Sequence, residues 1–440
     1  EIYNDAGNLT GYYDDQVDNY SQNHYQLHYN QVLSATTSLN ISGHYTKGSG
    51  YYEEYQNSDS LGTYGITGTT EVYGDVVRRL WLDNDFYGVV YNLDYKKDKL
   101  NLIIGGGANY YDGIHFGELV WARYAGNTQP GDRFYISYGD KLDANVYAKA
   151  YYDFTSRFQA FADVQYRRVS LSGNGDDEND RVIDFSDDFN FVNPKAGLSY
   201  RASEKMSFYA SYAVAHREPN RQDYIENDEK PKAETLNDLE VGGRFSVGNM
   251  KLNVNYFLMQ YQDQLVLTGK LNNVGYPIRS NVGQSYRTGV ELEAQANFLN
   301  NTLLWMPNLT VSTHKNVDYV GDDLTEYGNT PIAYSPNLIG GSVLKYTGIK
   351  NFEIAVQNKY VGEQFLDNTG NDRYRLEAYF LTDLRLSYNL SILNLNRCQL
   401  QLSIFNLTDE RYISNGYVYG TPYYYAQAGI NYMAGLRVEL

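Results

Sequence analysis

The feature that most constrains the fold is an alternation of apolar and polar residues that runs along nearly the whole chain to its last residue. In the closing segment AGINYMAGLRVEL, the apolar set is Ile430, Tyr432, Ala434, Leu436, Val438 and Leu440, and the residues between them are mostly polar. Successive side chains of a β-strand point to opposite faces, so this period predicts strands with one dry and one wet face. No convincing amphipathic helix is found, and the chain is therefore predicted to be all-β.

The same pattern defines strands far upstream of the end. Residues 87–95 (YGVVYNLDY) place a large apolar side chain at every second position, and residues 157–167 (RFQAFADVQYR) alternate apolar with charged or amide side chains. No run of about 18 apolar residues occurs, which excludes a helical membrane protein. A membrane barrel is not excluded, because each of its strands turns only alternate residues toward lipid.

The connections between the predicted strands alternate between very short and long. The short ones are 96–99, 155–157, 203–205 and 348–350, and the long ones are 48–83, 112–132, 169–190, 217–234, 268–283, 315–335 and 408–427. This alternation places the tight turns at one end of an antiparallel sheet and the long loops at the other. Outer-membrane barrels have this arrangement, with short periplasmic turns and long extracellular loops.

Aromatic residues gather beside the predicted short turns, on the dry face. They are Tyr29, Phe154, Phe158, Tyr200, Phe208, Phe298, Tyr346 and Phe352. A ring of amphipathic aromatic side chains at a membrane interface explains this position. The alternative explanation is general β-propensity, which also favours Tyr and Phe. The clustering beside the turns favours the interfacial ring.

The formal net charge of −17 argues against nucleic acid as a partner, because binding nucleic acid needs a basic surface. No hydrolase, kinase or dinucleotide-binding motif is present, so the chain is predicted not to be an enzyme, and no cofactor is expected. The Gly-rich stretch IIGGGANYY (103–111) lies within a predicted strand, with no following helix to hold a phosphate.

The strand count bears on how the chain is organised. Residues 1–20 are polar and loop-like, and about 17 strands follow from near Ser21. Single-chain bacterial barrels have even numbers of strands, so an odd count indicates that the start of the barrel is missing. Residues 1–20 are then interpreted as the tail of an extracellular loop, and residues 21–440 as the C-terminal part of a transmembrane antiparallel β-barrel.

Several stretches together resemble the β-barrel of a TonB-dependent outer-membrane receptor of the kind common in Bacteroidetes. They are NPKAGLSYRASEKMSFYASYAVAHREPNRQDY, AETLNDLEVGGRF, YQDQLVLTGKLNNVGYPIRSNVGQSYRTGVELEA, FNLTDERYISNGYVYG and AGINYMAGLRVEL. The resemblance covers nearly the whole chain. It implies a barrel of about 22 strands around an N-terminal plug that carries the box touching TonB. By this resemblance, the plug and about the first five strands are expected to be missing from this sequence.

The resemblance also implies a function and a location. A receptor of this family sits in the bacterial outer membrane, contacts lipid and lipopolysaccharide, and is coupled to the TonB complex through its plug. It takes up a scarce small-molecule ligand such as a ferric siderophore, haem or cobalamin. Two alternatives remain: a porin-like passive barrel, and a soluble β-repeat protein that binds glycans. Near-constant repeat length is typical of the last class, whereas these loops vary widely.

One histidine pair is a candidate ligand site. If the turn after Tyr29 centres on Ser34, Tyr29 pairs with Leu39, and His24 lies opposite His44 on the wet face. Directly opposed side chains have Cβ atoms about 5 Å apart, close enough to share a metal or a haem-type ligand. The alternative is two lumen-facing polar residues, and no third metal ligand is visible.

Two arginines in the segment AHREPNR form a second candidate site at the start of a long loop. Arg217 and Arg221 can hold an anionic chelate by bidentate hydrogen bonds. Structural pairing is the favoured alternative, with Glu218, Asp223, Glu291 and Glu293 as the expected partners. The tyrosine-rich segment GYVYGTPYYYAQ (416–427) leaves a similar choice between stacking on an aromatic ligand and packing on itself.

Overall fold

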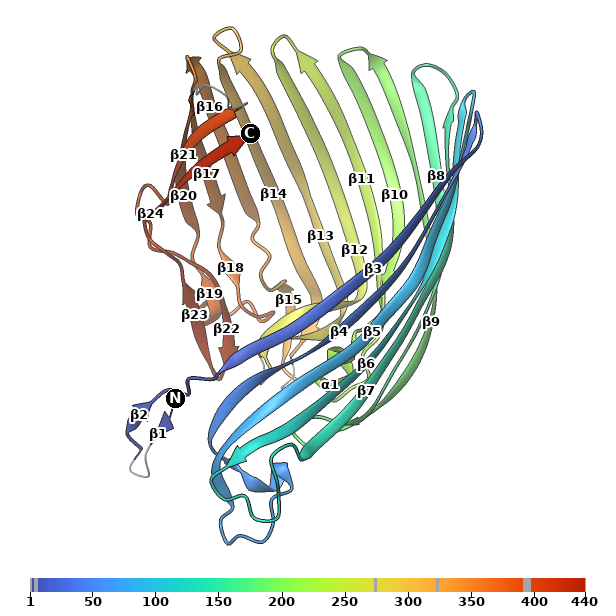
Figure 1. Cartoon of the computed structure of the whole chain (residues 1–440). Coiled ribbons are helices and arrows are strands. Elements are labelled where there is room, and N and C mark those ends of the chain that lie inside the picture. The colour runs from blue at the N-terminus through green and yellow to red at the C-terminus, as the bar shows by residue number, and fades with distance from the viewer. Residues whose placement is uncertain (1, 4–6, 273–274, 322–323, 391–396, 440) are drawn as a thin grey trace. The chain divides into compact units, whose positions relative to one another are not determined.

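The computed structural model describes residues 2–3, 7–272, 275–321, 324–390 and 397–439. The chain divides into two compact units: residues 1–150 with 163–193 form unit 1, and residues 151–162 with 194–440 form unit 2. Within the described ranges, no helix is long and apolar enough to cross a bilayer. Each unit is built from long antiparallel strands (Figure 1).

Unit 1 is a succession of hairpins. Its elements are β1 (Ile2–Tyr3), β2 (Leu9–Gly11), β3 (Val17–Ser34), β4 (Thr37–Ser60), η1 (Leu61–Tyr64), β5 (Tyr73–Lys97), β6 (Leu100–Ala122), most of β7 (Arg133–Asp153), and parts of β8 (Phe158–Asp176) and β9 (Val182–Ser203). Strands β3, β4, β5 and β6 pair in chain order, each antiparallel to the next. The Gly-rich stretch lies inside β6, as the sequence predicts.

Unit 2 continues the same scheme. Its elements are β10 (Met206–Arg217), α1 (Arg221–Ile225), β11 (Glu234–Val247), β12 (Met250–Leu271), β13 (Pro277–Phe298), β14 (Leu303–Val320), β15 (Glu326–Pro331), β16 (Leu338–Ile349), β17 (Phe352–Val361), β18 (Gln364–Phe365), η2 (Asp372–Tyr374), β19 (Arg375–Leu376), β20 (Tyr379–Leu390), β21 (Arg397–Phe405), β22 (Ile413–Tyr419), β23 (Thr421–Ala426) and β24 (Asn431–Glu439). The long strands from β10 to β24 pair antiparallel in chain order, while β15 extends the pairing of β14, and β18–β19 and β22–β23 are separate two-stranded ribbons.

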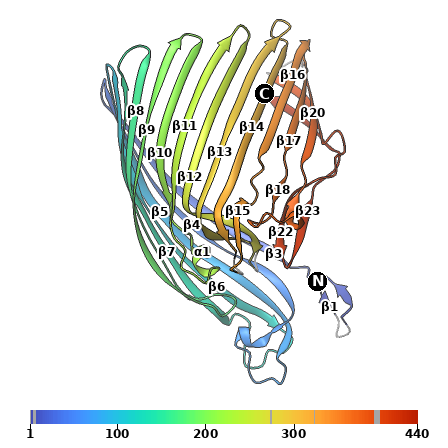
Figure 2. The ribbon, with the colours of Figure 1, turned by 180° about the vertical axis from the view of Figure 1, so that it is seen from behind.

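The predicted alternation of connections is confirmed within unit 2, where tight turns gather at one end and longer loops at the other (Figure 2). We call these the short-turn end and the long-loop end. Several tight turns use left-handed backbone at residues that tolerate it, such as Gly248 (φ 59°) and Asn351 (φ 62°). Gly and Asn adopt this conformation at low cost, so they close hairpins that carry two long strands.

Some strands are longer than the sequence indicated. A connection was expected over 48–83, but β4 runs to Ser60 and β5 begins at Tyr73, so the loop covers only 61–72. Similarly, β3 begins at Val17 rather than near Ser21. The physical reason is that a strand can continue past the lipid-facing belt, where like residues stand in adjacent pairs, such as Tyr51–Tyr52, Glu53–Glu54 and Val76–Val77. The apolar–polar contrast then disappears although the hydrogen-bonded ladder does not.

A row of tyrosines crosses β3 to β6 on the dry face. Tyr25 pairs with Tyr45, Tyr45 with Tyr87, and Tyr87 with Tyr110. The rings of Tyr25 and Tyr45 stack with centroids 6.0 Å apart, and those of Tyr87 and Tyr110 are 5.7 Å apart. Just beyond this row, on the same face, Lys47 forms an ion pair of 2.9 Å with Asp85. The change from aromatic to charged side chains is that of a membrane–water interface.

The sheet of unit 1 continues beyond this row with a second aromatic row. The ring of Trp81 lies 4.5 Å from that of Tyr51 and 5.7 Å from that of Phe116. The guanidinium groups of Arg79 and Arg133 lie over Tyr51 and Phe116, 4.4 and 3.9 Å from the ring centroids. Cation–π contacts therefore cover the rings where the sheet stands in water.

Consecutive residues of β8 offer a test of which face meets lipid. Val164 is on the dry face and 48% exposed, while Gln165 accepts a hydrogen bond of 3.0 Å from Asn193 on the opposite face. Val164→Arg should lower the free energy of unfolding in lipid vesicles by about 2–4 kcal/mol if the position lies near the bilayer midplane. Gln165→Arg is the matched control and should cost much less. Equal losses in denaturant titrations of the two variants would contradict the membrane orientation of this strand.

Candidate functional site

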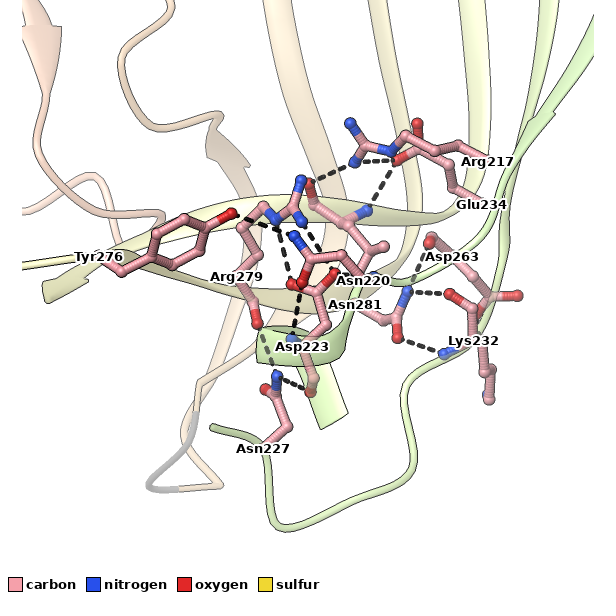
Figure 3. Close-up of polar contacts among 11 residues, drawn as sticks. Arg217, Asn220, Asp223, Asn227, Lys232, Glu234, Asp263, Tyr276, Arg279 and Asn281 are labelled. Carbon is pink, nitrogen blue, oxygen red and sulfur yellow. Dashed lines mark hydrogen bonds and ion pairs between the residues drawn. The ribbon is translucent and has the colours of Figure 1, made fainter. Parts of the chain in front are cut away.

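The loop between β10 and β11 is fastened at the long-loop end by a network of polar side chains (Figure 3). The network starts at α1, where Asn220 is the N-cap. The side chain of Asn220 accepts a hydrogen bond of 3.0 Å from the Asp223 amide, and the carboxylate of Asp223 accepts one of 2.8 Å from the Asn220 amide. This reciprocal capping satisfies amides that a helix start otherwise leaves without partners.

Asp223 also joins this loop to β13. Its two carboxylate oxygens accept hydrogen bonds of 3.1 and 2.9 Å from Nε and Nη2 of Arg279. The Asp223 side chain is 2% exposed, so this two-point ion pair is almost completely shielded from water. Asn227 closes the arrangement by donating from Nδ2 to the backbone oxygens of both Asp223 and Arg279, each at 2.8 Å.

A second asparagine fastens the return of the loop. Asn281 on β13 accepts a hydrogen bond of 2.8 Å from the Lys232 amide and donates to the Lys232 carbonyl at 3.0 Å. It also donates to the Asp263 carbonyl at 2.6 Å. One amide side chain thus satisfies backbone groups of a segment that has no strand partner there.

Arg217 is engaged within the protein. Its Nη2 atom donates to Glu234 Oε2 at 3.0 Å and to the Leu265 carbonyl at 3.3 Å. This is the structural pairing favoured from the sequence, although Glu234 was not among the carboxylates expected as partners. The pair forms because Arg217 and Glu234 are directly opposed on β10 and β11, a register that the sequence pattern leaves open. Arg221 is the first residue of α1 and donates to Gln222 Oε1 at 3.2 Å.

The structure contradicts the predicted pairing of His24 with His44. Ser34 pairs with Thr37, so Tyr29 lies opposite Ile41 rather than Leu39, and the register is shifted by two residues. His24 faces Thr46, and its Nδ1 lies 3.0 Å from Thr46 Oγ1, while His44 Nε2 lies 2.9 Å from Asn109 Oδ1. The prediction failed because a two-residue shift keeps the dry faces together equally well.

Neither histidine belongs to a metal-binding cluster in the described ranges, since no group of three or more His, Cys, Asp or Glu residues is suitably placed there. Both rings instead lie within hydrogen-bonding distance of neutral side chains: Thr46 on the neighbouring strand for His24, and Asn109 two strands away for His44.

A pocket of about 500 Å³ opens among the loops at the long-loop end of unit 2. It is lined by Leu267, Gly269, Lys270, Leu271, Pro277, Tyr334, Gln364, Ser414, Asn415 and Gly416. The lining comes from the paired ends of β12 and β13, from Tyr334, and from the short strands β18 and β22. Tyr334 joins two of these parts by donating to the Gly416 carbonyl at 3.0 Å. Burial raises the pKa of Tyr334 to about 12, so its phenol is neutral and keeps its proton for this bond.

Buried amides hold the frame of this pocket. Asn368 is 1% exposed, donates to the Leu267 carbonyl at 2.7 Å and accepts from the Ala333 amide at 2.9 Å. Asn316 on β14 is fully buried and donates to Asn368 Oδ1 at 3.3 Å. Because a buried amide that loses its partners is costly, these bonds fix the positions of the pocket-lining loops.

The tyrosine-rich segment folds as the ribbon β22–β23 and packs on itself. The ring of Tyr417 stacks on that of Tyr423 with centroids 5.1 Å apart and also contacts Tyr425 at 5.8 Å. Packing within the segment is therefore one of the two outcomes considered from the sequence. Nothing in the sequence pattern indicated that Gly416, or Ser414 and Asn415 just before the segment, would line a pocket.

Comparison with solved structures identifies the fold. The ferric-catecholate import receptor Fiu from Escherichia coli K12 in its closed form superposes with a TM-score of 0.68 and 14% sequence identity, covering 98% of this chain and 65% of Fiu. The siderophore receptor PiuA from Acinetobacter baumannii gives a TM-score of 0.70 at 16% identity, covering 96% of this chain and 65% of PiuA. The protein therefore has the fold of large outer-membrane receptor barrels, which confirms the predicted transmembrane antiparallel β-barrel.

Sequence comparison identifies the family. The family described as TonB dependent receptor-like, beta-barrel matches residues 2–407, and the chain belongs to this family. The ferrioxamine B receptor of Salmonella typhimurium is 27% identical over 255 residues, which are 57% of this chain and 34% of the receptor. The chain thus spans about a third of the length of the curated relatives it matches. The assignment places the protein in the bacterial outer membrane and contradicts the soluble β-repeat alternative.

The Asp223–Arg279 pair provides a test of how the loop is held. Asp223→Ala leaves the guanidinium without its counter-charge and removes a capping carboxylate, so we expect a local loss of about 3–5 kcal/mol. Residues 218–233 should then be cleaved faster in limited proteolysis and exchange amide hydrogens faster. The control is Asp188→Ala, which removes an ion pair whose side chains are 54% and 58% exposed and should cost less than about 1 kcal/mol. Unchanged cleavage of the loop in Asp223→Ala would contradict this account.

Proposed function

We propose that this chain forms the greater part of the barrel of an energy-coupled receptor that takes up a ferric siderophore. The observation that carries the proposal is the family assignment over residues 2–407, together with the similarity to a ferrioxamine B receptor. The fold of receptors for other iron chelates adds support. A plug that carries the contact to TonB is part of the proposal, as is the Bacteroidetes type of the receptor.

In this proposal, the ligand is captured at the long-loop end, which faces the outside of the cell. The pocket framed by Asn316 and Asn368 is preorganised by buried hydrogen bonds, so closing on a ligand costs little further ordering of these loops. Its lining combines the apolar Leu267 and Pro277 with the polar Gln364, a mixture that suits a chelate with an organic scaffold and polar oxygen atoms.

The passage of ligand then follows the wet face of the strands. On β13 this face carries Arg287, Glu291 and Glu293, and on the neighbouring β12 it carries Asn253 and Asn255. Polar side chains of this kind exchange hydrogen bonds with a hydrated ligand, whereas the dry face is turned to lipid. Arg217 and Arg221 enter this proposal as supports of the loop at the outer end, because their observed bonds are internal.

The proposal is tested first on the native protein, extracted from a washed outer-membrane fraction. Its intact mass should exceed the 50.3 kDa of this chain by the mass of a plug and further strands. A mass equal to that of the chain would overturn the plugged, TonB-coupled receptor.

Transport is tested with radioactive iron in a strain that depends on this gene. Uptake of at least one ferric siderophore from a panel should require the gene and should stop when TonB is deleted or the proton gradient is collapsed. A porin-like passive barrel would give uptake that survives both treatments. That result, or no gene-dependent uptake of any ferric siderophore, would overturn the proposal.

A filled pocket should impair capture of the ligand. Ser414 lines the pocket and is only partly exposed, so Ser414→Trp introduces a bulky ring there. Its apparent affinity for the transported siderophore should fall about tenfold or more, as expected when a few kcal/mol of contacts are lost. The control is Gln129→Trp in the exposed loop between β6 and β7, which does not line this pocket. Unchanged affinity in Ser414→Trp would remove the pocket from the proposed site.

A further inference from the structure

A second pocket lies at the short-turn end of unit 2, far along the strands from the long-loop end. It measures about 190 Å³, and three arginines contribute to its lining: Arg157, Arg201 and Arg244. Arg201 and Arg244 both pair with Ser207 in the sheet, one on each side of β10. Arg157 is adjacent to Arg201, because its carbonyl accepts a hydrogen bond of 2.7 Å from the Arg201 amide. Neighbouring strands thus present three guanidinium groups in one row.

These arginines lack ion pairs of the kind that Arg217 and Arg279 form. Across the described residues, no carboxylate oxygen lies within 4.0 Å of their guanidinium nitrogens, in contrast to Arg217 and Arg279. The guanidinium of Arg244 lies 5.2 Å from the ring centroid of Tyr209. Asp153 also lines the pocket, but its carboxylate accepts a hydrogen bond of 2.8 Å from Gln159 and is outside ion-pair distance of the arginines.

The charged groups around this pocket are mainly positive. Three cations and a single carboxylate border a small polar space, and the hydroxyl groups of Ser199 and Ser207 line the same space. Arg201 and Arg244 flank Ser207 from the two neighbouring strands and Arg157 lies beside Arg201, so their like charges repel one another, and an anion placed between them relieves that repulsion. Guanidinium groups present paired N–H donors that match the oxygens of a carboxylate or phosphate. The volume suits one such group and is too small for a whole chelate.

We propose that Arg157, Arg201 and Arg244 form an oxyanion-binding site on the wet face at the short-turn end, with a carboxylate or phosphate group as its ligand. The role of the site rests on the proposed function, in which this end faces the periplasm. The site then lies where an imported ligand leaves the lumen. An anionic group on that ligand is held there after it has left the long-loop end.

Binding is measured on the native protein in detergent, with inorganic phosphate and with citrate as probes. Titration calorimetry and the ³¹P line width of phosphate should show saturable, salt-sensitive binding. Arg201→Gln should weaken it about tenfold or more, because a charge-assisted bond is lost. A crystal soaked in selenate should show an anomalous peak among the three arginines. No saturable binding of either probe, or equal binding by wild type and Arg201→Gln, would overturn the site.

The matched control is Arg385→Gln on β20. Arg385 is exposed and lies between Ala355 and Ser403 in the sheet, without a neighbouring cation at those positions. This variant should bind both probes as the wild type does. An equal loss in both variants would show that general charge, rather than the arginine row, attracts the anion, and would overturn the proposal.

Uptake assays distinguish the source of the anion. If the anionic group is carried by the imported chelate, Arg201→Gln should slow uptake of an anionic ferric tricarboxylate more than uptake of an uncharged ferric trihydroxamate. If the site takes a free anion, binding of phosphate is lost in the variant while both uptake rates change equally or not at all. Both results support the site. The binding measurements need no transport. Anion binding can therefore be observed even if siderophore uptake is not, and siderophore uptake can be observed even if anion binding is not.

Discussion

The structure depends on one constraint: in a membrane, the backbone of each strand must find its hydrogen-bond partners in other strands, because lipid supplies none. Antiparallel pairing in chain order satisfies this requirement with the shortest connections, and the pairing runs through β3 to β6 and through β10 to β24. The side chains are then free to differ completely on the two faces. The dry face is apolar and bordered by tyrosines, while the wet face carries amides and charges.

Beyond the ends of the β-ladder, side chains supply the hydrogen bonds that the backbone N–H and C=O groups need. At the long-loop end, three side chains accept hydrogen bonds from backbone amides outside the strands: the Asp223 carboxylate from Asn220, Asn281 from Lys232, and Asn368 from Ala333. Amides suit this work because each carries both a donor and an acceptor, without the cost of burying a charge. Asp223 is a deeply buried carboxylate, and a guanidinium lies against both of its oxygens. Local polar bonds therefore order these loops, together with a small apolar cluster of Val266, Val282 and Ile332.

The sequence predicts the elements of this fold well and their extent poorly. The period of two identified the strands and their faces, and the spacing of the connections identified the two ends of the sheet. Both depend only on the local rule that successive side chains of a strand point to opposite faces. Registers are not fixed by that rule: the pairing of His24 was wrong by two residues, a shift that leaves every side chain on its expected face. Strand ends were missed where both faces enter water, as in β4 beyond the tyrosine row.

The lining of the candidate site is harder to predict from the sequence than the strand registers are. Its lining residues, such as Leu267, Gln364 and Asn415, come from segments almost 150 residues apart, and their meeting depends on loop conformations that have no period. The cross-strand pair Arg217–Glu234 depends on the register of β10 and β11, which the long loop 218–233 leaves open in the sequence. What the sequence cannot supply is the set of buried amide bonds that brings separate loops together, because Asn is equally common in exposed turns.

The second aromatic row of unit 1 changes what the outer part of this protein offers to its surroundings. Tyr51, Trp81 and Phe116 stand on a sheet that continues past the interface, with Arg79 and Arg133 lying across their rings. A loop of the same length would sample many conformations and would lose conformational entropy each time it bound a partner. The paired strands of a sheet have already lost this conformational entropy during folding. The region is therefore a rigid β-sheet surface outside the membrane. Single substitutions can change the chemistry of this surface while the backbone keeps its shape.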